Sequence, residues 1–591
     1  MRVAVPGIAR NGAPFTFDFE GVAVEAWAGE SLGAALLSAG IVGLRTTARG
    51  EPRGLYCGMG VCGECRVMVD GVARRACMTA ASHGQRVARA PSRAIPVAAA
   101  PVPAHLLRTP DVLVVGAGPA GLSAARVAAA AGLDVLVADE RGQAGGQYYK
   151  QPATGFAIDE AALDAQFGEG RALAKAAVAA GSTLLFSATL WSAARDQDGA
   201  LELLFLVDGA VLPVRPRRLV LATGAYERAW PVPGGTLPGV MTTGAAQTLL
   251  RAYGTAPGRR VLVAGNGPLN LQVACELRRA GVEVVALAEQ ARAPLSIGPA
   301  LAMARHAPGL VLDGLRQLAG LARGGVPIHY GHVLSQVDGD ERACAATVAR
   351  IDANGAAIAG TERRYEVDAV CLGYGFHPQA EAARAIGCRF TAQPGGGMAA
   401  VRADDGRSSV DEVFIAGDGG GLGGARAAGA QGIAAGTAVA NDLEAPRRGA
   451  LAGERARALR DLQRHRAFQD ALWRVYAPAS SRPVVIAPAA LLCRCESVAA
   501  GAVDGLVGEG VGDLGAVKRA SRLGMGACQA RYCGPLLAAR LDPHGRADPP
   551  GFAPRPPFKP IPISAIAGLA QDVLAQQTNV RTKNIDEPSA A

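Results

Sequence analysis

Long apolar runs are missing from this 591-residue sequence: no stretch of about 18 residues is apolar and free of charge, so no membrane-spanning helix is predicted. The first residues, MRVAVPGIARNGAPF, hold no continuous apolar segment of the kind found in a secretory signal. We therefore expect a cytoplasmic protein, with peripheral membrane association left open. The net charge of +9 is mild for this length, and no basic stripe with interleaved aromatic residues appears, so nucleic-acid binding is not expected.

Cysteine is scarce, with 12 residues, of which eight lie in two groups. Disulfides are rare in the cytoplasm, so grouped cysteines indicate metal ligands or redox groups. The others stand alone, and we expect them to be small buried apolar residues: Cys275, Cys344, Cys371 and Cys388. The nucleotide-binding regions described below contain no C-x-x-C pair, which argues against a thiol–disulfide reductase. No substrate-oxidising base or nucleophile is evident, so no catalytic residue is predicted.

The first cysteine group lies in GLYCGMGVCGECRVMVDGVARRAC, with the spacing C-x4-C-x2-C, eleven residues and a fourth cysteine. Glycines between the cysteines allow the backbone to wrap a compact anionic centre and to direct amide groups at sulfide. The Asp70–Gly71 pair predicts a tight turn between two strands. This arrangement matches that of a plant-type ferredoxin with a 2Fe–2S cluster, and a zinc site fits the spacing less well. The candidate ligands are Cys57, Cys62, Cys65 and Cys77.

Alternating residues at 15–29 predict a hairpin before this group, and 30–40 predict a short helix. These elements together resemble a ferredoxin-type β-grasp domain.

The second cysteine group has the pattern C-x-C, 32 residues and C-x4-C, in LLCRCESV and GMGACQARYCGP. It resembles the bacterioferritin-associated-ferredoxin type of 2Fe–2S domain. Two short helices are expected between the cysteine pairs, and a further helix is expected to begin near the last cysteine. Zinc remains the alternative metal. The candidate ligands are Cys493, Cys495, Cys528 and Cys533.

A dinucleotide-binding motif begins at DVLVVGAGPAGLSAARVAAAAGLDVLVADER. An apolar strand leads into a glycine-rich turn, a helix and a second strand that ends at an acidic residue. In this register the glycines permit close approach of a pyrophosphate, the helix N-terminus favours its charge, and the acid can accept hydrogen bonds from a ribose. The candidate residues are Gly116, Gly118, Pro119, Gly121, Asp139, Glu140 and Arg141.

Three later segments resemble parts of flavoproteins that bind two dinucleotides, and they favour FAD in this first site. DERGQAGGQYY resembles the loop near the flavin, LVLATGAYE contains the Ala-Thr-Gly turn, and EVFIAGDGGG resembles the second FAD motif, whose Asp contacts the ribityl and pyrophosphate region. These segments add Gly146, Gln147, Thr223, Gly224, Gly417 and Asp418.

A second strand–turn–helix–strand unit lies in RRVLVAGNGPLNLQVACELRRAGVEVVALAEQ, with candidate residues Gly265, Gly267 and Glu289. Asn270 replaces the third glycine, and its larger side chain should push the helix away from the sheet. A Rossmann fold is therefore expected, while bound NAD(H), another adenine nucleotide, or no nucleotide all remain open. The acid at Glu289 disfavours NADP.

The predicted fold class is α/β and multidomain, with an N-terminal β-grasp 2Fe–2S domain, a Rossmann-type flavoprotein core with two dinucleotide-binding units, and a small helical C-terminal 2Fe–2S domain. The expected boundaries are a ferredoxin-like domain at 1–90, a linker at 91–109, FAD-binding segments at 110–255 and 386–445, an NAD(P)-binding-like domain at 256–385, a helical linker at 446–485, the second cluster domain at 486–545, and a tail at 546–591. Residues beyond 570 are polar, and we expect a docking or disordered segment there.

The whole architecture resembles the electron-transfer subunits of hydrogen cyanide synthase, opine oxidases, D-hydroxyproline dehydrogenase and sarcosine oxidase (α subunit), with the ferredoxin-type protein fused to the FAD subunit. The resemblance implies a relay in the order cluster, flavin, cluster. It also implies a D-amino-acid-oxidase-type flavoprotein partner that oxidises an amine or imino acid, and an external electron acceptor. Two alternatives remain open: an NAD(P)H-dependent flavin and iron–sulfur reductase, and a non-enzymatic scaffold that binds zinc.

Overall fold

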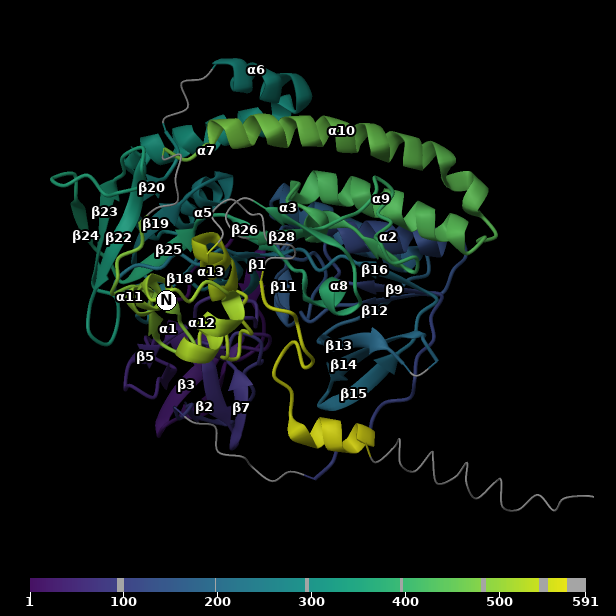
Figure 1. Cartoon of the computed structure of the whole chain (residues 1–591), viewed down its shortest axis with the longest axis horizontal. Coiled ribbons are helices and arrows are strands. Elements are labelled where there is room, and N and C mark those ends of the chain that lie inside the picture. Colours follow the sequence, from purple (N-terminus) through teal and green to yellow (C-terminus); the bar gives the residue numbers. More distant parts are fainter. Residues whose placement is uncertain are drawn as a thin grey trace, which may run out of the picture.

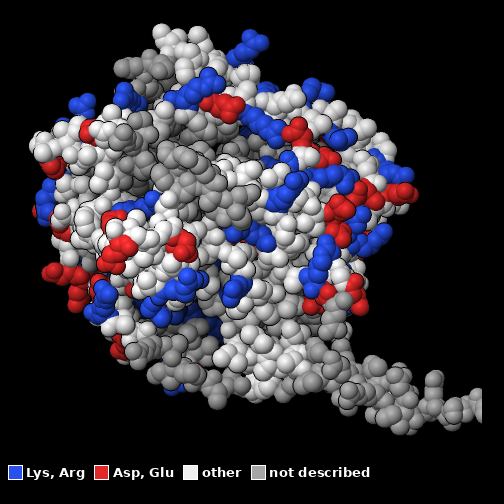
Figure 2. All heavy atoms as spheres, in the orientation of Figure 1, with Lys and Arg blue, Asp and Glu red and all other residues white. Residues whose placement is uncertain are grey.

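The computed structural model describes residues 1–92, 100–196, 198–292, 297–393, 397–479, 485–541 and 551–570. In Figure 1 the N-terminal domain lies below the flavoprotein core, and a long helix runs across the opposite side. Within the described residues, no helix is both long and apolar enough to cross a membrane. Figure 2 shows Lys and Arg side chains interspersed with Asp and Glu over the face in view. The tail beyond residue 570 lies outside the described residues.

The N-terminal domain is a five-stranded sheet that packs on helix α1 (Leu32–Ser38). Phe17 and Phe19 are buried while the residues between them face outward, as the alternation predicts. Asp70 and Gly71 both have positive φ, which a two-residue hairpin turn requires. The sheet order is β3 (Val22–Ala26), β2 (Phe15–Phe19), β8 (Arg86–Arg89), β6 (Arg66–Val69), β7 (Val72–Arg75). The short pair β4 (Arg45–Thr46) and β5 (Pro52–Arg53) precedes the first cysteine loop.

The first nucleotide-binding unit is a parallel sheet whose central strand, β9 (Val112–Val115), is buried along its whole length. Helix α2 (Pro119–Ala130) packs against α9 (Gly424–Asp442), and α3 (Ala165–Ala179) lies beside α2. The sheet order is β12 (Thr183–Leu185), β10 (Val135–Ala138), β9, β16 (Arg218–Leu221), β29 (Val413–Ile415). An antiparallel sheet extends from it, with β13 (Thr189–Arg195), β14 (Leu201–Val207) and β15 (Ala210–Val214).

The second nucleotide-binding unit has its own five-stranded parallel sheet. Its first strand, β18 (Val240–Thr242), and the following helix α4 (Thr243–Tyr253) precede residue 256, where the sequence placed the boundary. The sheet order is β18, β25 (Ala369–Gly373), β19 (Arg260–Gly265), β20 (Glu283–Glu289), β21 (Ile328–Tyr330). Its helices are α5 (Pro268–Arg279), α6 (Ile297–His306) and α7 (Pro308–Arg323), and an antiparallel sheet adds β22 (His332–Asp338), β23 (Ala345–Arg350) and β24 (Arg363–Glu366).

Smaller elements join these units. The pair β1 (Ile8–Arg10) and β11 (Phe156–Ile158) ties the N-terminus to the core. Helix α10 (Ala452–Val475) runs over α9 and contacts α6 (Figure 1). The other elements are β17 (Ala225–Glu227), β26 (Phe376–Pro378), α8 (Glu381–Ala385), β27 (Phe390–Gln393), β28 (Gly397–Ala400), η1 (Gly417–Gly420) and η2 (Arg448–Leu451).

The C-terminal unit is small and largely helical, and it lies against the cysteine loop of the N-terminal domain. The two helices expected between the cysteine pairs are present, and a third begins at Cys533. Its elements are β30 (Leu491–Cys493), β31 (Val498–Ala499), α11 (Ala500–Gly508), α12 (Leu514–Ser521) and α13 (Cys533–Leu541).

Candidate cofactor sites

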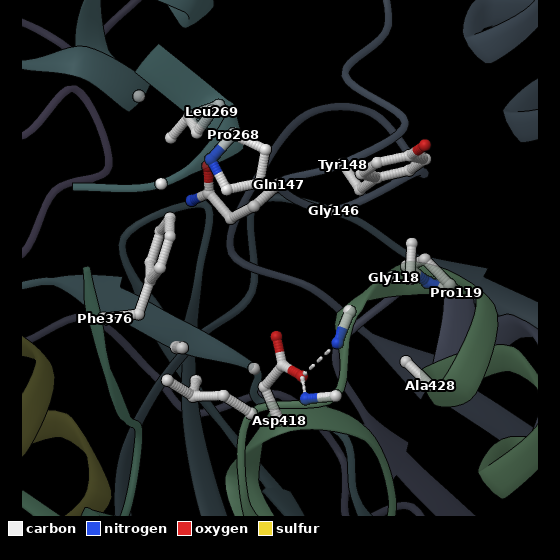
Figure 3. A pocket seen from close by; sticks show the side chains of 18 of the residues that line it. Gly118, Pro119, Gly146, Gln147, Tyr148, Pro268, Leu269, Phe376, Asp418 and Ala428 are labelled. Carbon is white, nitrogen blue, oxygen red and sulfur yellow. Dashed lines mark hydrogen bonds between the residues drawn. The ribbon is translucent and has the colours of Figure 1, made fainter. Parts of the chain in front are cut away.

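A cavity of about 930 Å³ lies between the two nucleotide-binding units and is lined by the predicted residues of both. This volume is at the upper end of the range for ligand pockets, which suits an extended ligand such as a dinucleotide. In Figure 3, Gly118, Gly146 and Asp418 surround one part of the cavity, and Gln147 and Phe376 lie across from them. Met59, from the first cysteine loop, also reaches the wall.

The glycine turn after β9 is packed so closely that larger residues cannot enter it. A Cβ at Gly121 would lie 1.8 Å from the Gly116 carbonyl oxygen, and a Cβ at Gly116 would lie 2.4 Å from the Ala222 carbonyl oxygen. The exposed amides at the start of α2 therefore face the cavity across a surface without side chains, where a pyrophosphate can approach.

The acidic residue after β10 is held by the glycine turn itself. The Asp139 carboxylate accepts hydrogen bonds from the Ala117 amide at 2.6 Å and from the Arg141 amide at 2.8 Å. Burial raises the pKa of Asp139, and these two amides oppose that rise. Glu140 forms an ion pair with Lys559, a residue that lies 419 positions away along the chain and also lines the cavity. Lys559 was not predicted, because its lone position in a proline-rich segment gives no signal.

The second FAD motif places Asp418 at the start of α9 (Figure 3). Its carboxylate accepts hydrogen bonds from the amides of Gly423 at 2.9 Å and Gly424 at 3.3 Å. Gly417 has a φ of +75°, which lets the chain turn directly after β29. Thr223 donates a hydrogen bond to the Gln379 carbonyl oxygen at 3.2 Å, which ties the Ala-Thr-Gly turn to the same side of the cavity.

Two buried ionisable residues in the cavity wall were not predicted. Burial raises the pKa of Glu227 to about 7 and lowers the pKa of Lys150 to about 7. Glu227 accepts from the Gly244 amide at 2.9 Å, and Lys150 donates to the Gly244 carbonyl oxygen at 3.0 Å and to the Gln247 side chain at 2.9 Å. Both residues can therefore exchange a proton near neutral pH beside the cavity.

In the second nucleotide-binding unit, Glu289 closes on its own glycine turn. Its carboxylate accepts from the Gly267 amide at 3.1 Å and from the Ala291 amide at 2.9 Å, and burial raises its pKa to about 7. A Cβ on Gly265 would lie 2.1 Å from the Gly373 carbonyl oxygen, so this first glycine is required by close packing against β25.

Asn270 turns into the sheet rather than away from it. It is 1% exposed, donates to the Gly373 carbonyl oxygen at 2.8 Å and accepts from the Thr243 hydroxyl at 3.0 Å. The space above the missing third glycine is thus filled by hydrogen bonds between α5, α4 and β25. The side chain compensates for the separation that its size was expected to impose.

Helix α10 covers the second glycine turn. The ring of Trp473 lies 3.6 Å from the position that a Cβ on Gly267 would take. The segment after α10 is fixed nearby, because the Ala479 amide donates to the Gln290 carbonyl oxygen at 3.1 Å and Arg292 donates to the Ala479 carbonyl oxygen at 3.1 Å. An indole ring therefore occupies the approach that a pyrophosphate would need.

The first four candidate ligands converge as two pairs of buried thiols. Cys57 hydrogen-bonds with Cys62, and Cys65 with Cys77. The Cys62 amide donates to the Cys57 sulfur and the Glu64 amide to the Cys62 sulfur, each at 3.4 Å. Burial opposes ionisation of Cys57, but hydrogen bonds from Cys62 and from nearby amides lower its pKa to about 6. The loop thus favours thiolate, the form that binds iron or zinc.

The second four candidate ligands form two further pairs, Cys493 with Cys533 and Cys495 with Cys528. Hydrogen bonding from Cys533 lowers the pKa of Cys493 to about 6, and hydrogen bonding from Cys495 lowers that of Cys528. Cys495 is half-buried, while the other three are buried.

The pairing bears on the kind of metal centre. Within the ranges that the structure describes, no three His, Cys, Asp or Glu side chains converge as a site for one metal ion. Two separate thiol pairs on one loop suit two irons, each held by one pair, better than a single tetrahedral zinc. The chemistry of the donor sets therefore fits 2Fe–2S clusters.

The four isolated cysteines divide into two classes. Cys275, Cys371 and Cys388 are buried, as predicted, but the prediction for Cys344 was wrong because its side chain is exposed. It lies in a turn between strands rather than within one.

Comparison with known proteins decides the family. Residues 12–91 match the model of the 2Fe-2S iron-sulfur cluster binding domain, and residues 110–432 match that of the pyridine nucleotide-disulphide oxidoreductases. One opine oxidase subunit, from Agrobacterium tumefaciens, is 33% identical over 72% of this chain and 84% of that protein. Hydrogen cyanide synthase subunit HcnB of Pseudomonas aeruginosa is 32% identical over 78% of this chain and 99% of that protein. The chain belongs to this family.

Members of this family include the sarcosine oxidase α subunit of Corynebacterium, which is 30% identical over 45% of this chain. The crystal structure of L-proline dehydrogenase from P. horikoshii has the same fold, with a TM-score of 0.65, 21% identity, and coverage of 93% of this chain and 97% of that one. The family resemblance inferred from the motifs is thus confirmed, as is the fold class of a ferredoxin-type domain joined to a flavoprotein core. The chain is an oxidoreductase, with FAD and an iron–sulfur cluster as cofactors.

Proposed function

We propose that this chain is the electron-transfer subunit of an amine or imino-acid dehydrogenase complex, and that it carries one FAD and two 2Fe–2S clusters. The observation that carries this proposal is the placement of two paired-thiol sites beside a dinucleotide-sized cavity. When bound, the FAD supplies exchange of one or two electrons, and each cluster carries one.

The chain's own residues have distinct proposed roles. The glycine turn at Gly116–Gly121 receives the pyrophosphate, and Asp139 and Glu140 lie on the ribose side, where Lys559 holds Glu140 in place. Gly146, Gln147, Thr223 and Asp418 surround the remainder of the FAD site. The eight paired cysteines hold the two clusters.

The relatives suggest what the complex does. The opine oxidase protein, hydrogen cyanide synthase subunit HcnB and the sarcosine oxidase α subunit each bear the name of one subunit of a larger enzyme. We therefore propose a hetero-oligomer in which a D-amino-acid-oxidase-type flavoprotein oxidises the substrate and passes electrons to this chain, which delivers them to an external acceptor.

The test is co-purification of the tagged chain from its native host, followed by a dye-reduction assay with sarcosine, proline and opines. We expect a second flavoprotein in the complex and substrate-dependent dye reduction that is lost when the chain is purified alone. Full-rate oxidation by the isolated chain would contradict the proposal. Zinc in place of iron and labile sulfide would support the scaffold alternative instead.

The second nucleotide-binding unit is proposed not to receive hydride from NAD(H). The support is steric, because Trp473 stands over Gly267 and the Glu289 carboxylate is already bound by two amides. This separates the chain from an NAD(P)H-dependent reductase.

A further inference from the structure

The two cysteine groups, which are about 430 residues apart in the chain, are in direct contact in space. The Cys495 sulfur lies 3.9 Å from the carbonyl oxygen of Cys62. A small cavity between the groups is lined by Cys62, Cys493, Cys495, Cys528 and Cys533. The order cluster, flavin, cluster implied by the sequence therefore differs from the structure, in which the two cysteine groups adjoin each other.

Buried charges fasten the two cluster loops together at this contact. Glu64, from the first loop, is 1% exposed and lies among three arginines. Its carboxylate meets Arg45 at 2.7 Å and Arg53 at 3.4 Å within its own domain, and Arg494 of the C-terminal unit at 3.9 Å. Arg494 stands between two ligands, Cys493 and Cys495, so the clamp joins the ligand loops themselves.

Backbone packing supports the same close approach. A Cβ on Gly63, between ligands of the first loop, would lie 3.4 Å from the Ala527 side chain, which directly precedes Cys528. Arg53 also donates to the Ser497 hydroxyl at 3.4 Å, two residues after Cys495. Four contacts of different kinds therefore fix the two loops against each other.

The FAD cavity lies to one side of this pair. Met59, between two ligands of the first loop, lines the cavity, and its sulfur lies 3.8 Å from the Gln147 side-chain nitrogen. Tyr226 also lines the cavity, and its ring lies 5.8 Å from that of Tyr532, which directly precedes Cys533. Tyr532 in turn lies 5.7 Å from Tyr56, which directly precedes Cys57.

We propose that the two clusters act as one adjoining pair that exchanges electrons directly across the Cys62–Cys495 contact, with the FAD beside the pair rather than between its members. This inference rests on the proposed function. A fully reduced flavin gives up two electrons, and each 2Fe–2S cluster accepts one, so the pair takes both while the released proton passes to solvent. The pair then delivers single electrons to the acceptor.

The experiment uses the full-length purified chain, kept anaerobic, with iron and labile sulfide measured first. About four irons per chain are expected for two clusters. Electron paramagnetic resonance spectra are then recorded during stepwise reduction by dithionite. At low reduction we expect signals from isolated spins. At full reduction we expect broadened lines and a half-field signal, because two reduced clusters in contact couple magnetically.

Single-cluster variants provide the matched comparison. Cys77→Ser removes a ligand of the first cluster and Cys533→Ser removes one of the second, and each variant should show only an uncoupled signal. A fully reduced wild-type spectrum whose line shape never changes during the titration, and which has no half-field signal, would overturn the adjoining pair even if neither variant folds. Absence of iron would instead overturn the proposed function, so the two failures are distinguishable.

Discussion

Trp473 and Gly267 are in van der Waals contact: a methyl group placed on the glycine would meet the indole ring at 3.6 Å. This contact joins the long helix α10 to the turn that would hold a pyrophosphate in the second nucleotide-binding unit. It has a direct consequence for reduction of the flavin by nicotinamide cofactors.

We expect NADH to leave the flavin absorbance of the anaerobic wild-type protein unchanged over minutes. Trp473→Ala should open the turn without supplying the missing third glycine, so bleaching should remain slow. The measurement is absorbance near 450 nm after addition of millimolar NADH. Rapid bleaching of the wild type would show that the unit does accept a hydride donor.

Gly121→Ala should abolish FAD binding, because its methyl group would lie 1.8 Å from the Gly116 carbonyl oxygen and would force α2 away from β9. The measurement is the ratio of flavin to protein after gel filtration. Gly142→Ala is the control, since a Cβ at this nearby glycine meets nothing within 4 Å. The control should retain wild-type flavin content, and a fully loaded Gly121→Ala protein would refute the placement of the pyrophosphate.

Lys559→Met should weaken FAD retention, since it removes the ion pair to Glu140 and leaves that carboxylate without its largest favourable interaction. Breaking a partly buried ion pair by removing one partner costs about 1–3 kcal/mol, so we expect roughly a tenfold loss of affinity. Lys559→Arg keeps the charge and should restore most of the affinity. Flavin fluorescence released during dialysis reports the difference, and equal release from all three proteins would contradict the proposed role.

His377 makes the folded protein sensitive to acid. Burial, followed by repulsion from Arg228, lowers its pKa from 6.5 to about 3, so the folded state keeps the ring neutral while the unfolded chain takes up a proton below pH 6.5. The stabilising contribution is therefore present above pH 6.5 and is lost as the pH falls towards 3. Since one pKa unit corresponds to about 1.4 kcal/mol, about 2 kcal/mol should be lost between pH 7 and pH 5.

The variant that tests this is His377→Gln, which cannot titrate. Urea-unfolding midpoints, followed by flavin release, should fall less between pH 7 and pH 5 in the variant than in the wild type. An identical pH dependence in both proteins would show that His377 is not held neutral in the folded state.

Much of the candidate site could be predicted because its information is local. The glycine turn at Gly116–Gly121 and the acid at Asp139 lie within one strand–helix–strand unit, and their spacing follows from the length of that unit. The Asp70–Gly71 hairpin was likewise predictable, because a two-residue turn demands residues that tolerate positive φ. Asn270 was only partly predictable: its size was visible, but its partners Thr243 and Gly373 lie in other elements.

The sequence by itself determined the kinds of centre in this protein, because ligand spacing and nucleotide motifs are set by short-range backbone geometry. Only the tertiary structure decided how the centres are arranged. The contact of Cys62 with Cys495, the ion pair of Glu140 with Lys559 and the position of Trp473 over Gly267 each join residues more than 200 positions apart. Such contacts depend on how whole domains pack, and no local pattern of residues encodes that packing.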